Sequence, residues 1–297
     1  MSRFKVKRNQ GDAAREISSK STKEVSSGRK VTGFFGLFDI LGYRSLIENN
    51  SLEELIKIYN SVVSGIDEAA VTINHTDEDQ WLSFDTVGSF MFSDTIVLFQ
   101  EYSTTNLPGG SFILKAALLM RLAFEKGIPL RGAISYGEYY IDENCYLGKP
   151  IVEAYETEKI QEWAGAVLCN SAEREYALDM DRRSNAKAIN FHGIELNPAV
   201  MMSPFMENLI VQYDVPTKNG ISSKQALCWD DYVPVFCNVD LPLLEPHIFE
   251  NRVHESFSKH NKEINDDSVK RKMENTVDFL RFLETQPIST RIVYRGY

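Results

Sequence analysis

The sequence predicts an α+β fold in which the strands of one sheet alternate along the chain with amphipathic helices. Three observations indicate this. Residues 31–41 form an apolar run typical of a strand buried on both faces, residues 81–99 form a hairpin pattern, and helical periodicity separates the two. With the elements that follow, the alternation is that of a ferredoxin-like α/β sandwich.

The first helix is predicted from its start signal and its spacing. Ser51 and Glu54 form a capping box, with the serine and the glutamate three residues apart. The apolar positions that follow recur at helical spacing: Leu52, Leu55, Ile56, Tyr59, Val62, Val63 and Ile66. A polar loop around residues 75–80 then leads to the hairpin, whose tight turn we place at Ser93–Asp94.

The next elements alternate between helix and strand. Residues 108–126 read as a helix ended by Gly127, and residues 128–140 as a strand. Pro150 suits the first turn of a helix that we expect to reach Trp163. A short strand (166–169) and a short helix (171–178) complete this part of the chain.

The sequence pattern changes after about residue 185. A strand over 208–216 leads to a Lys-Asn-Gly turn, and residues 266–284 have the apolar spacing of an amphipathic helix. We therefore divide the chain into a basic arm (1–30), a first domain (31–174) and an α/β extension packed on that domain (175–297).

Charge is distributed unevenly between the arm and the rest of the chain. Residues 1–30 hold nine Lys or Arg against three acidic residues, a net charge of +6, whereas the whole chain carries −10. The arm is rich in serine and poor in apolar residues, so we expect a disordered or loosely attached segment. A solvated tail is favoured over a nucleic-acid-binding arm.

Two further patterns suggest a cytoplasmic protein. No secretory signal opens the sequence, and the most apolar long stretch (112–124) is interrupted by Lys115 and Arg121, so no membrane span is expected. The cysteines are Cys145, Cys169, Cys228 and Cys237, with no CxxC pair, which favours reduced thiols over a zinc site.

Asp39 is the first candidate site residue, since it interrupts the apolar stretch FGLFDILGY (35–43). A buried carboxylate must find a partner, bind a cation or take up a proton. If the hairpin pairs beside the first strand, Asp94 emerges at the same end of the sheet. Two such carboxylates, with the carbonyl of Ile40, could hold a pair of Mg²⁺ or Mn²⁺ ions, and the amides of residues 41–43 suit a triphosphate.

Composition alone also allows a simpler interpretation. The chain has 42 acidic residues, so a structural Asp at a strand end and a turn Asp is favoured when only these two positions are considered. Dinucleotide and P-loop glycine motifs are absent, as are metalloprotease and esterase motifs. Arg131 opens a strand and could equally form a structural ion pair or contact phosphate.

Four segments, in this order, resemble class III nucleotide cyclases. GLFDILGY (36–43) resembles their first metal-binding strand and MFSDTIVLF (91–99) their second metal-binding hairpin. LRGAISYGE (130–138) and YLGKPIVEAYETEKI (146–160) resemble the strand and helix that follow. The resemblance implies a βααββαβ cyclase sandwich with Asp39 and Asp94 as catalytic metal ligands. The nucleotide-binding residues that it implies are Phe38, Leu41, Gly42, Tyr43, Ser93 and Arg131.

The sequence departs from purine cyclases at the helix that supplies their Asn and Arg. Aligned on Gly148, those positions are Val152 and Glu156, and the base-reading Lys and Asp positions fall near Gly88 and Cys145. Either the protein is inactive or it reads another base with other helpers. Arg44, Arg131 and Lys149 could take over the phosphate charge.

The variant pattern of Gly148, Glu153, Ala154, Tyr155 and Glu158 resembles the pyrimidine cyclases of bacterial Pycsar anti-phage systems. Segments 211–220, 226–231 and 272–282 are similar to that group too. The resemblance implies a homodimer, with sites at the interface, that converts UTP or CTP to the 3′,5′-cyclic monophosphate, which a separate effector senses. The alternatives are a purine cyclase and a non-catalytic nucleotide-binding module; a palm-type polymerase or dinucleotide cyclase lacks its GGDEF-like segment.

Overall fold

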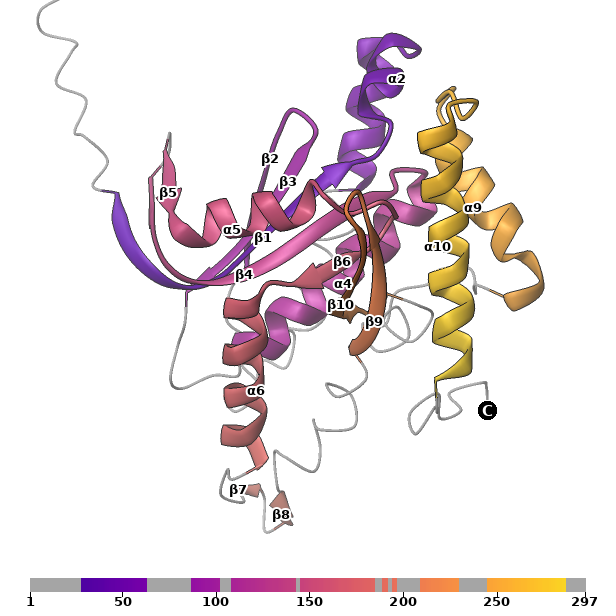
Figure 1. The fold of residues 1–297 in the computed structure, drawn as a ribbon. Helices are drawn as coiled ribbons and strands as arrows, with labels where there is room; N and C mark the ends of the chain where they lie inside the picture. Colours follow the sequence, from indigo (N-terminus) through magenta and orange to yellow (C-terminus); the bar gives the residue numbers. More distant parts are fainter. Residues whose placement is uncertain are drawn as a thin grey trace, which may run out of the picture.

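The computed structural model describes residues 28–62, 87–101, 108–142, 145–184, 189–191, 194–196, 209–229 and 245–286. Within these ranges the chain forms an eight-stranded sheet in the order β2-β3-β1-β4-β6-β10-β9, with β5 paired to β4 (Figure 1). Its strands are β1 (Arg29–Ile40), β2 (Gly88–Phe92), β3 (Thr95–Glu101), β4 (Leu130–Ile141), β5 (Tyr146–Gly148), β6 (Ala166–Leu168), β9 (Ile210–Thr217) and β10 (Gly220–Leu227). A separate hairpin pairs β7 (Ile189–Phe191) with β8 (Ile194–Leu196).

Helices connect and cover these strands. They are α2 (Tyr43–Glu48), α4 (Pro108–Lys126), α5 (Lys149–Glu158), α6 (Asn170–Ser184), α9 (Phe249–Ser258) and α10 (Asp267–Thr285). Residues 52–62 are helical, and a 3-10 turn, η2 (Pro246–Ile248), precedes α9. The predicted α+β fold class is confirmed, because the order β2-β3-β1-β4, all antiparallel with helices between, is that of a ferredoxin-like sheet.

β1 is an inner strand of this sheet, between β3 and β4, and is buried on both faces. Phe34 stacks on Phe112 of α4, with ring centroids 5.6 Å apart, so alternate residues of β1 from Phe34 face α4. On the opposite face Ser135, the register partner of Phe35, donates to the carbonyl oxygen of Pro150 in α5 at 2.7 Å. The sheet is therefore covered by α4 on one face and by α5 on the other (Figure 1).

The helix α4 contains the most apolar long stretch of the sequence (112–124), and this stretch is buried. Its two interrupting cations are buried as well. Lys115 donates to the carbonyl oxygen of Val87 at 2.6 Å, and Arg121 forms an ion pair with Glu125. Each buried charge thus has a polar partner. Among the helices of the described ranges, none combines the length and the apolarity that a bilayer crossing would need.

The sheet continues into the C-terminal part of the chain. β6 lies parallel to β4, and β10 lies antiparallel to β6. The predicted Lys-Asn-Gly turn is confirmed between β9 and β10. Trp163 packs edge-on against Phe279 of α10 at 4.5 Å between ring centroids, so apolar contacts also tie the two parts together. The division at residue 174 stays a prediction.

Several predicted elements are confirmed and others are wrong in their bounds. The capping box forms, because both the amide and the hydroxyl of Ser51 donate to Glu54 at 2.8 Å. The helix beginning near Pro150 ends at Glu158 and does not reach Trp163. The residues after Glu158 pair instead with the end of β9. The amide of Glu162 donates to the carbonyl oxygen of Pro216, and the amide of Lys218 donates to that of Ile160. The helix predicted over 171–178 is longer, running from Asn170 to Ser184.

Other elements were not predicted at all, namely α2, β5, β10, η2, α9 and the β7–β8 hairpin. The first 27 residues of the basic arm, the predicted loop at 75–80 and the hairpin residues 81–86 lie outside the described residues. The same holds for Cys237. No disulfide joins Cys145, Cys169 and Cys228, the cysteines of the described ranges.

Candidate functional site

The structure brings Asp39 and Asp94 together at one end of the sheet. Asp39 lies at the end of β1 in register with Thr95, the first residue of β3. The amide of Ile40 donates to the carbonyl oxygen of Asp94 at 2.8 Å, so the two aspartates are neighbours across the β1–β3 pair. The predicted turn is confirmed at Ser93–Asp94, where Ser93 adopts a left-handed φ of 56°. Asp94 is thereby placed directly beside the end of β1.

The surroundings of the Asp39 carboxylate shift its pKa. Burial is the largest cause that raises the pKa of Asp39 above its ordinary value, and the nearby Asp94 raises it further. The Arg131 guanidinium lowers the pKa of Asp39, and Lys218 lowers it to a smaller extent. Two carboxylates that repel each other in a half-buried site favour a cation between or beside them.

Arg131 already supplies one positive charge to the site. Asp39 and Arg131 are register partners on β1 and β4, and Nη2 of Arg131 donates to Oδ2 of Asp39 at 3.0 Å. Nε donates to Glu158 Oε1 at 2.5 Å, and Nη1 donates to the carbonyl oxygen of Gln161 at 3.0 Å. All three guanidinium nitrogens are thus engaged. Of the two roles left open by the sequence, the structural ion pair is formed.

Glu158 was not among the predicted site residues and appeared only as part of the pyrimidine-cyclase motif. Its side chain is 8% exposed and lies on the last turn of α5, facing β4. Burial raises the pKa of Glu158 to about 6, although Arg131 lowers it, and Asp39 adds to the increase. The cluster of Asp39, Arg131 and Glu158 therefore places one buried cation between two carboxylates.

The remaining predicted nucleotide-binding residues occupy different environments. The Phe38 side chain is fully buried beside Gly132, so a nucleotide could meet only its main chain. Leu41 is buried and its amide donates to the carbonyl oxygen of Pro129 at 3.0 Å. Gly42 and Ser93 are exposed, and Tyr43 is half-buried at the start of α2. Their roles stay predictions.

A segment of the C-terminal part supports the turn that follows Asp39. We call residues 259–263 the strap. The amide of Glu263 donates to Ser45 Oγ at 2.8 Å, and Asn49 Nδ2 donates to the carbonyl oxygen of Asn261 at 2.9 Å. The Lys262 side chain passes under Gly42, where a Cβ would lie 3.3 Å from its Cδ. The strap thus joins α2 to the C-terminal helices, which no local sequence signal indicated.

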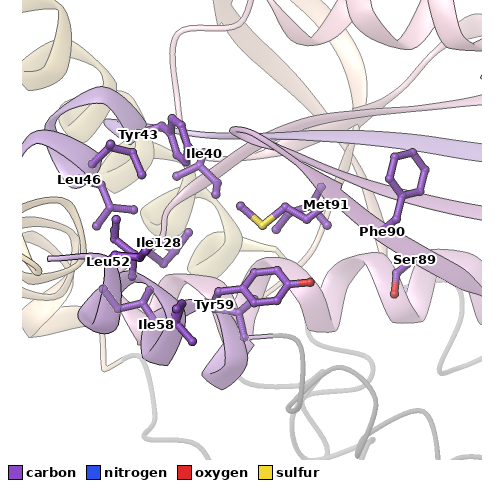
Figure 2. Close-up of a pocket in the computed structure, with 15 residues that line it drawn as sticks. Ile40, Tyr43, Leu46, Leu52, Ile58, Tyr59, Ser89, Phe90, Met91 and Ile128 are labelled. Carbon is purple, nitrogen blue, oxygen red and sulfur yellow. The ribbon is translucent and has the colours of Figure 1, made fainter. Parts of the chain in front are cut away.

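An apolar pocket of about 300 Å³ lies behind the same turn. Ile40 and Tyr43 form one wall, and Tyr59, Phe90 and Met91 stand around the opposite side (Figure 2). A lining of this kind has little to offer a triphosphate, which needs cations or amide donors. The charged cluster and the pocket therefore present different chemistry on either side of the end of β1.

The donor set at Asp39 and Asp94 fits divalent cations that prefer oxygen. Within the described ranges no group of three or more His, Cys, Asp or Glu side chains could hold a metal ion. Mg²⁺, however, is commonly bound by one or two carboxylates that share it with substrate phosphates and water. The two aspartates repel each other in this structure, so they match that mode and not a site enclosed by protein ligands alone.

No protein-family model matches the chain, and no curated protein does. Among solved structures the chain is similar to a bacterial light-regulated adenylyl cyclase, at 13% identity and a TM-score of 0.38 over 50% of this chain. That match covers 46% of the other chain, so this chain spans just under half of its length.

Two more solved structures are similar over a larger share of this chain. One is the catalytic core of a rhodopsin-guanylyl cyclase with converted specificity in complex with ATPalphaS, at 10% identity and a TM-score of 0.40, covering 68% of this chain and 98% of that one. The other is a class III adenylyl cyclase-like ATP-binding protein from Pseudomonas aeruginosa, at 9% identity and a TM-score of 0.36, covering 88% and 73%. The ferredoxin-like fold follows from the strand order and the antiparallel pairing of β2, β3, β1 and β4.

Proposed function

We propose that this protein is a nucleotide cyclase that converts UTP or CTP to the 3′,5′-cyclic monophosphate and pyrophosphate. The observation that carries the proposal is the convergence of Asp39 and Asp94 at one end of the ferredoxin-like sheet. The order of the four cyclase-like sequence segments supports it, since these two residues are the metal ligands that the resemblance implies.

In this reaction the ribose 3′-oxygen forms a bond to the α-phosphorus, the bond from that phosphorus to the bridging oxygen breaks, and pyrophosphate leaves with its electron pair. The 3′-hydroxyl proton leaves to water or to a nearby base. Two Mg²⁺ or Mn²⁺ ions, held by Asp39, Asp94 and the carbonyl of Ile40, would lower the pKa of the hydroxyl and offset phosphate charge. Asp39 and Asp94 supply the negative potential, and Arg131 fixes Asp39 in place.

The choice of a pyrimidine rests on α5. Val152 and Glu156, which align with the Asn and Arg of purine cyclases, both lie on the exposed side of this helix. Neither side chain can donate the hydrogen bonds of the residues it replaces. The pyrimidine-type motif on the same helix therefore supports UTP or CTP as substrate, and the resemblance adds a role in anti-phage defence through a separate cyclic-nucleotide-sensing effector.

We also propose a homodimer with sites at the interface. Three large apolar side chains are exposed close together on β5 and α5, namely Leu147 (60%), Val152 (57%) and Tyr155 (54%). A second copy that covers this surface would remove it from water. Sedimentation at micromolar concentration tests this: Tyr155→Glu should weaken the dimer, and an active monomeric wild type would contradict it.

The function is tested by incubating the full-length protein with each of the four nucleoside triphosphates and Mn²⁺, then identifying the products by mass. We expect one pyrimidine cyclic monophosphate and pyrophosphate in equal amounts. Asp39→Asn and Asp94→Asn should each lower the rate by about a hundredfold or more, because they remove charge from the reacting centre. Glu48→Gln, an exposed acid on α2, is the matched control and should retain full activity.

The outcomes separate the alternatives. A purine cyclic product identifies a purine cyclase. Nucleotide binding without pyrophosphate release identifies a non-catalytic module. A wild type that neither binds nor turns over any of the four nucleotides overturns the proposal.

A further inference from the structure

Arg131 is held in the site by two partners outside the aspartate pair. Glu158 accepts from Nε at 2.5 Å, and the carbonyl oxygen of Gln161 accepts from Nη1 at 3.0 Å. The Gln161 side chain is itself fixed, because its Nε2 donates to the carbonyl oxygen of Gly132 at 2.8 Å and its Oε1 accepts from Trp163 at 2.7 Å. The guanidinium therefore donates to Asp39 through Nη2 alone, and it cannot offer Asp39 a second nitrogen without breaking these bonds.

The members of this cluster are buried to different extents. The Arg131 side chain is 11% exposed and that of Glu158 is 8% exposed, whereas that of Asp39 is 24% exposed. The more accessible carboxylate is therefore the one beside Asp94, and the more buried carboxylate lies behind the guanidinium. Charges in such a site are screened weakly by solvent, so removing one of them changes the potential at its neighbours.

We infer that Glu158 is a positioning residue: it shares the charge of Arg131, so that Arg131 holds Asp39 in place without neutralising it as a ligand. This inference rests on the proposed function, since it concerns the affinity of the Asp39–Asp94 pair for a divalent cation. Asp39, Asp94 and Glu158 contribute three negative charges against one from Arg131. Without Glu158 the guanidinium would pair with Asp39 alone, and the cluster would lose half of its net negative charge.

The test is Mn²⁺ binding to the full-length protein at pH 8 without nucleotide, measured by calorimetry. Glu158→Gln keeps an oxygen for Nε of Arg131 and removes only the charge. We expect its Mn²⁺ affinity to fall by about tenfold or more, as is usual when a group behind a metal ligand is changed. Thermal unfolding without Mn²⁺ shows whether the fold is retained.

Two further variants make the result specific. Glu153→Gln removes a charge from the same helix, but Glu153 bonds to Ser171 and not to Arg131, so the affinity should stay within about twofold of wild type. The double variant Arg131→Gln/Glu158→Gln restores the net charge of the cluster. Its affinity should return to within about threefold of wild type, which a merely structural role for Glu158 would not produce.

Unchanged Mn²⁺ affinity in Glu158→Gln overturns the inference, and so does an equal loss in Glu153→Gln. If Glu158→Gln does not fold, the double variant carries the test, and loss of Mn²⁺ binding there overturns it. Parallel product assays keep the two proposals apart. An inactive wild type whose Mn²⁺ affinity depends on Glu158 removes the cyclase and leaves this inference standing. An active wild type whose affinity ignores Glu158 does the reverse.

Discussion

Two buried cations flank the turn that follows Asp39, and they are held in opposite ways. Arg131 lies between the carboxylates of Asp39 and Glu158. Lys262, on the strap, is 6% exposed and donates to the carbonyl oxygens of Gly127 and Ser256. Burial together with the nearby Lys259 lowers the pKa of Lys262 to about 7. A guanidinium stays charged whatever its partners are, whereas burial allows a lysine held only by carbonyl oxygens to lose its proton near neutrality.

The difference predicts unequal responses to losing each cation. Arg131→Met leaves Asp39 and Glu158 buried beside each other's charge, and breaking a buried pair in this way costs roughly 3–5 kcal/mol. We expect a loss of that size at pH 8 in urea unfolding. The loss should shrink as the pH falls, because both carboxyl groups can then take up protons. A loss below about 1 kcal/mol would mean that the cluster contributes little to stability.

The sequence could predict the aspartate pair, but it could not predict the contacts that hold the two cations. The pairing of Asp39 with Asp94 followed from a strand and an adjacent hairpin, both of which have local periodic patterns. Arg131 joins Asp39 across 92 positions and Glu158 across 27, while the strap reaches Ser45 across 218. Sequence periodicity reports only neighbours within a few turns. The strand tip could therefore be predicted, but the partners that tune it and the strap beneath it could not.

Gly42 lies in the turn that follows Asp39, beside the Lys262 side chain, and its substitution separates backbone strain from packing. Its φ is +77°, so Gly42→Ala costs roughly 1–2 kcal/mol from the left-handed conformation. The new methyl would also press on the Lys262 side chain. Introducing Gly42→Ala into Lys262→Ala should remove the loss of unfolding free energy that comes from packing. The loss that comes from the backbone should remain when the double variant is compared with Lys262→Ala by urea unfolding. If the double variant were as stable as Lys262→Ala alone, backbone strain at Gly42 would be absent.

Lys262 is expected to give the wild type a distinctive pH dependence. Its folded pKa of about 7 lies below its ordinary value of 10.5, so the unfolded chain binds the additional proton between these two values. Stability from this group is therefore lowest below pH 7 and rises as the pH increases towards 10.5. Between pH 7 and 8 the free energy of unfolding of the wild type should rise by about 1 kcal/mol more than that of Lys262→Met.

Parallel curves for the two proteins over this range would show that Lys262 keeps its proton. The contrast with Arg131 would then fail, because both buried cations would stay charged throughout this range. Lys259→Met, which removes the neighbouring lysine from the same strap, is the matched control and should raise the pKa of Lys262.

The smallest effect is expected from a third cation near the turn, Arg44 on α2. Its Nε donates to Glu48 at 2.9 Å, but its side chain is 90% exposed. Solvent and salt screen such a pair, and side-chain entropy offsets the remaining attraction. Arg44→Ala should leave urea unfolding unchanged within error at any salt concentration. A clear loss would mean that exposure does not separate this pair from the Arg131 cluster, and that α2 depends on charge rather than on the strap for its position.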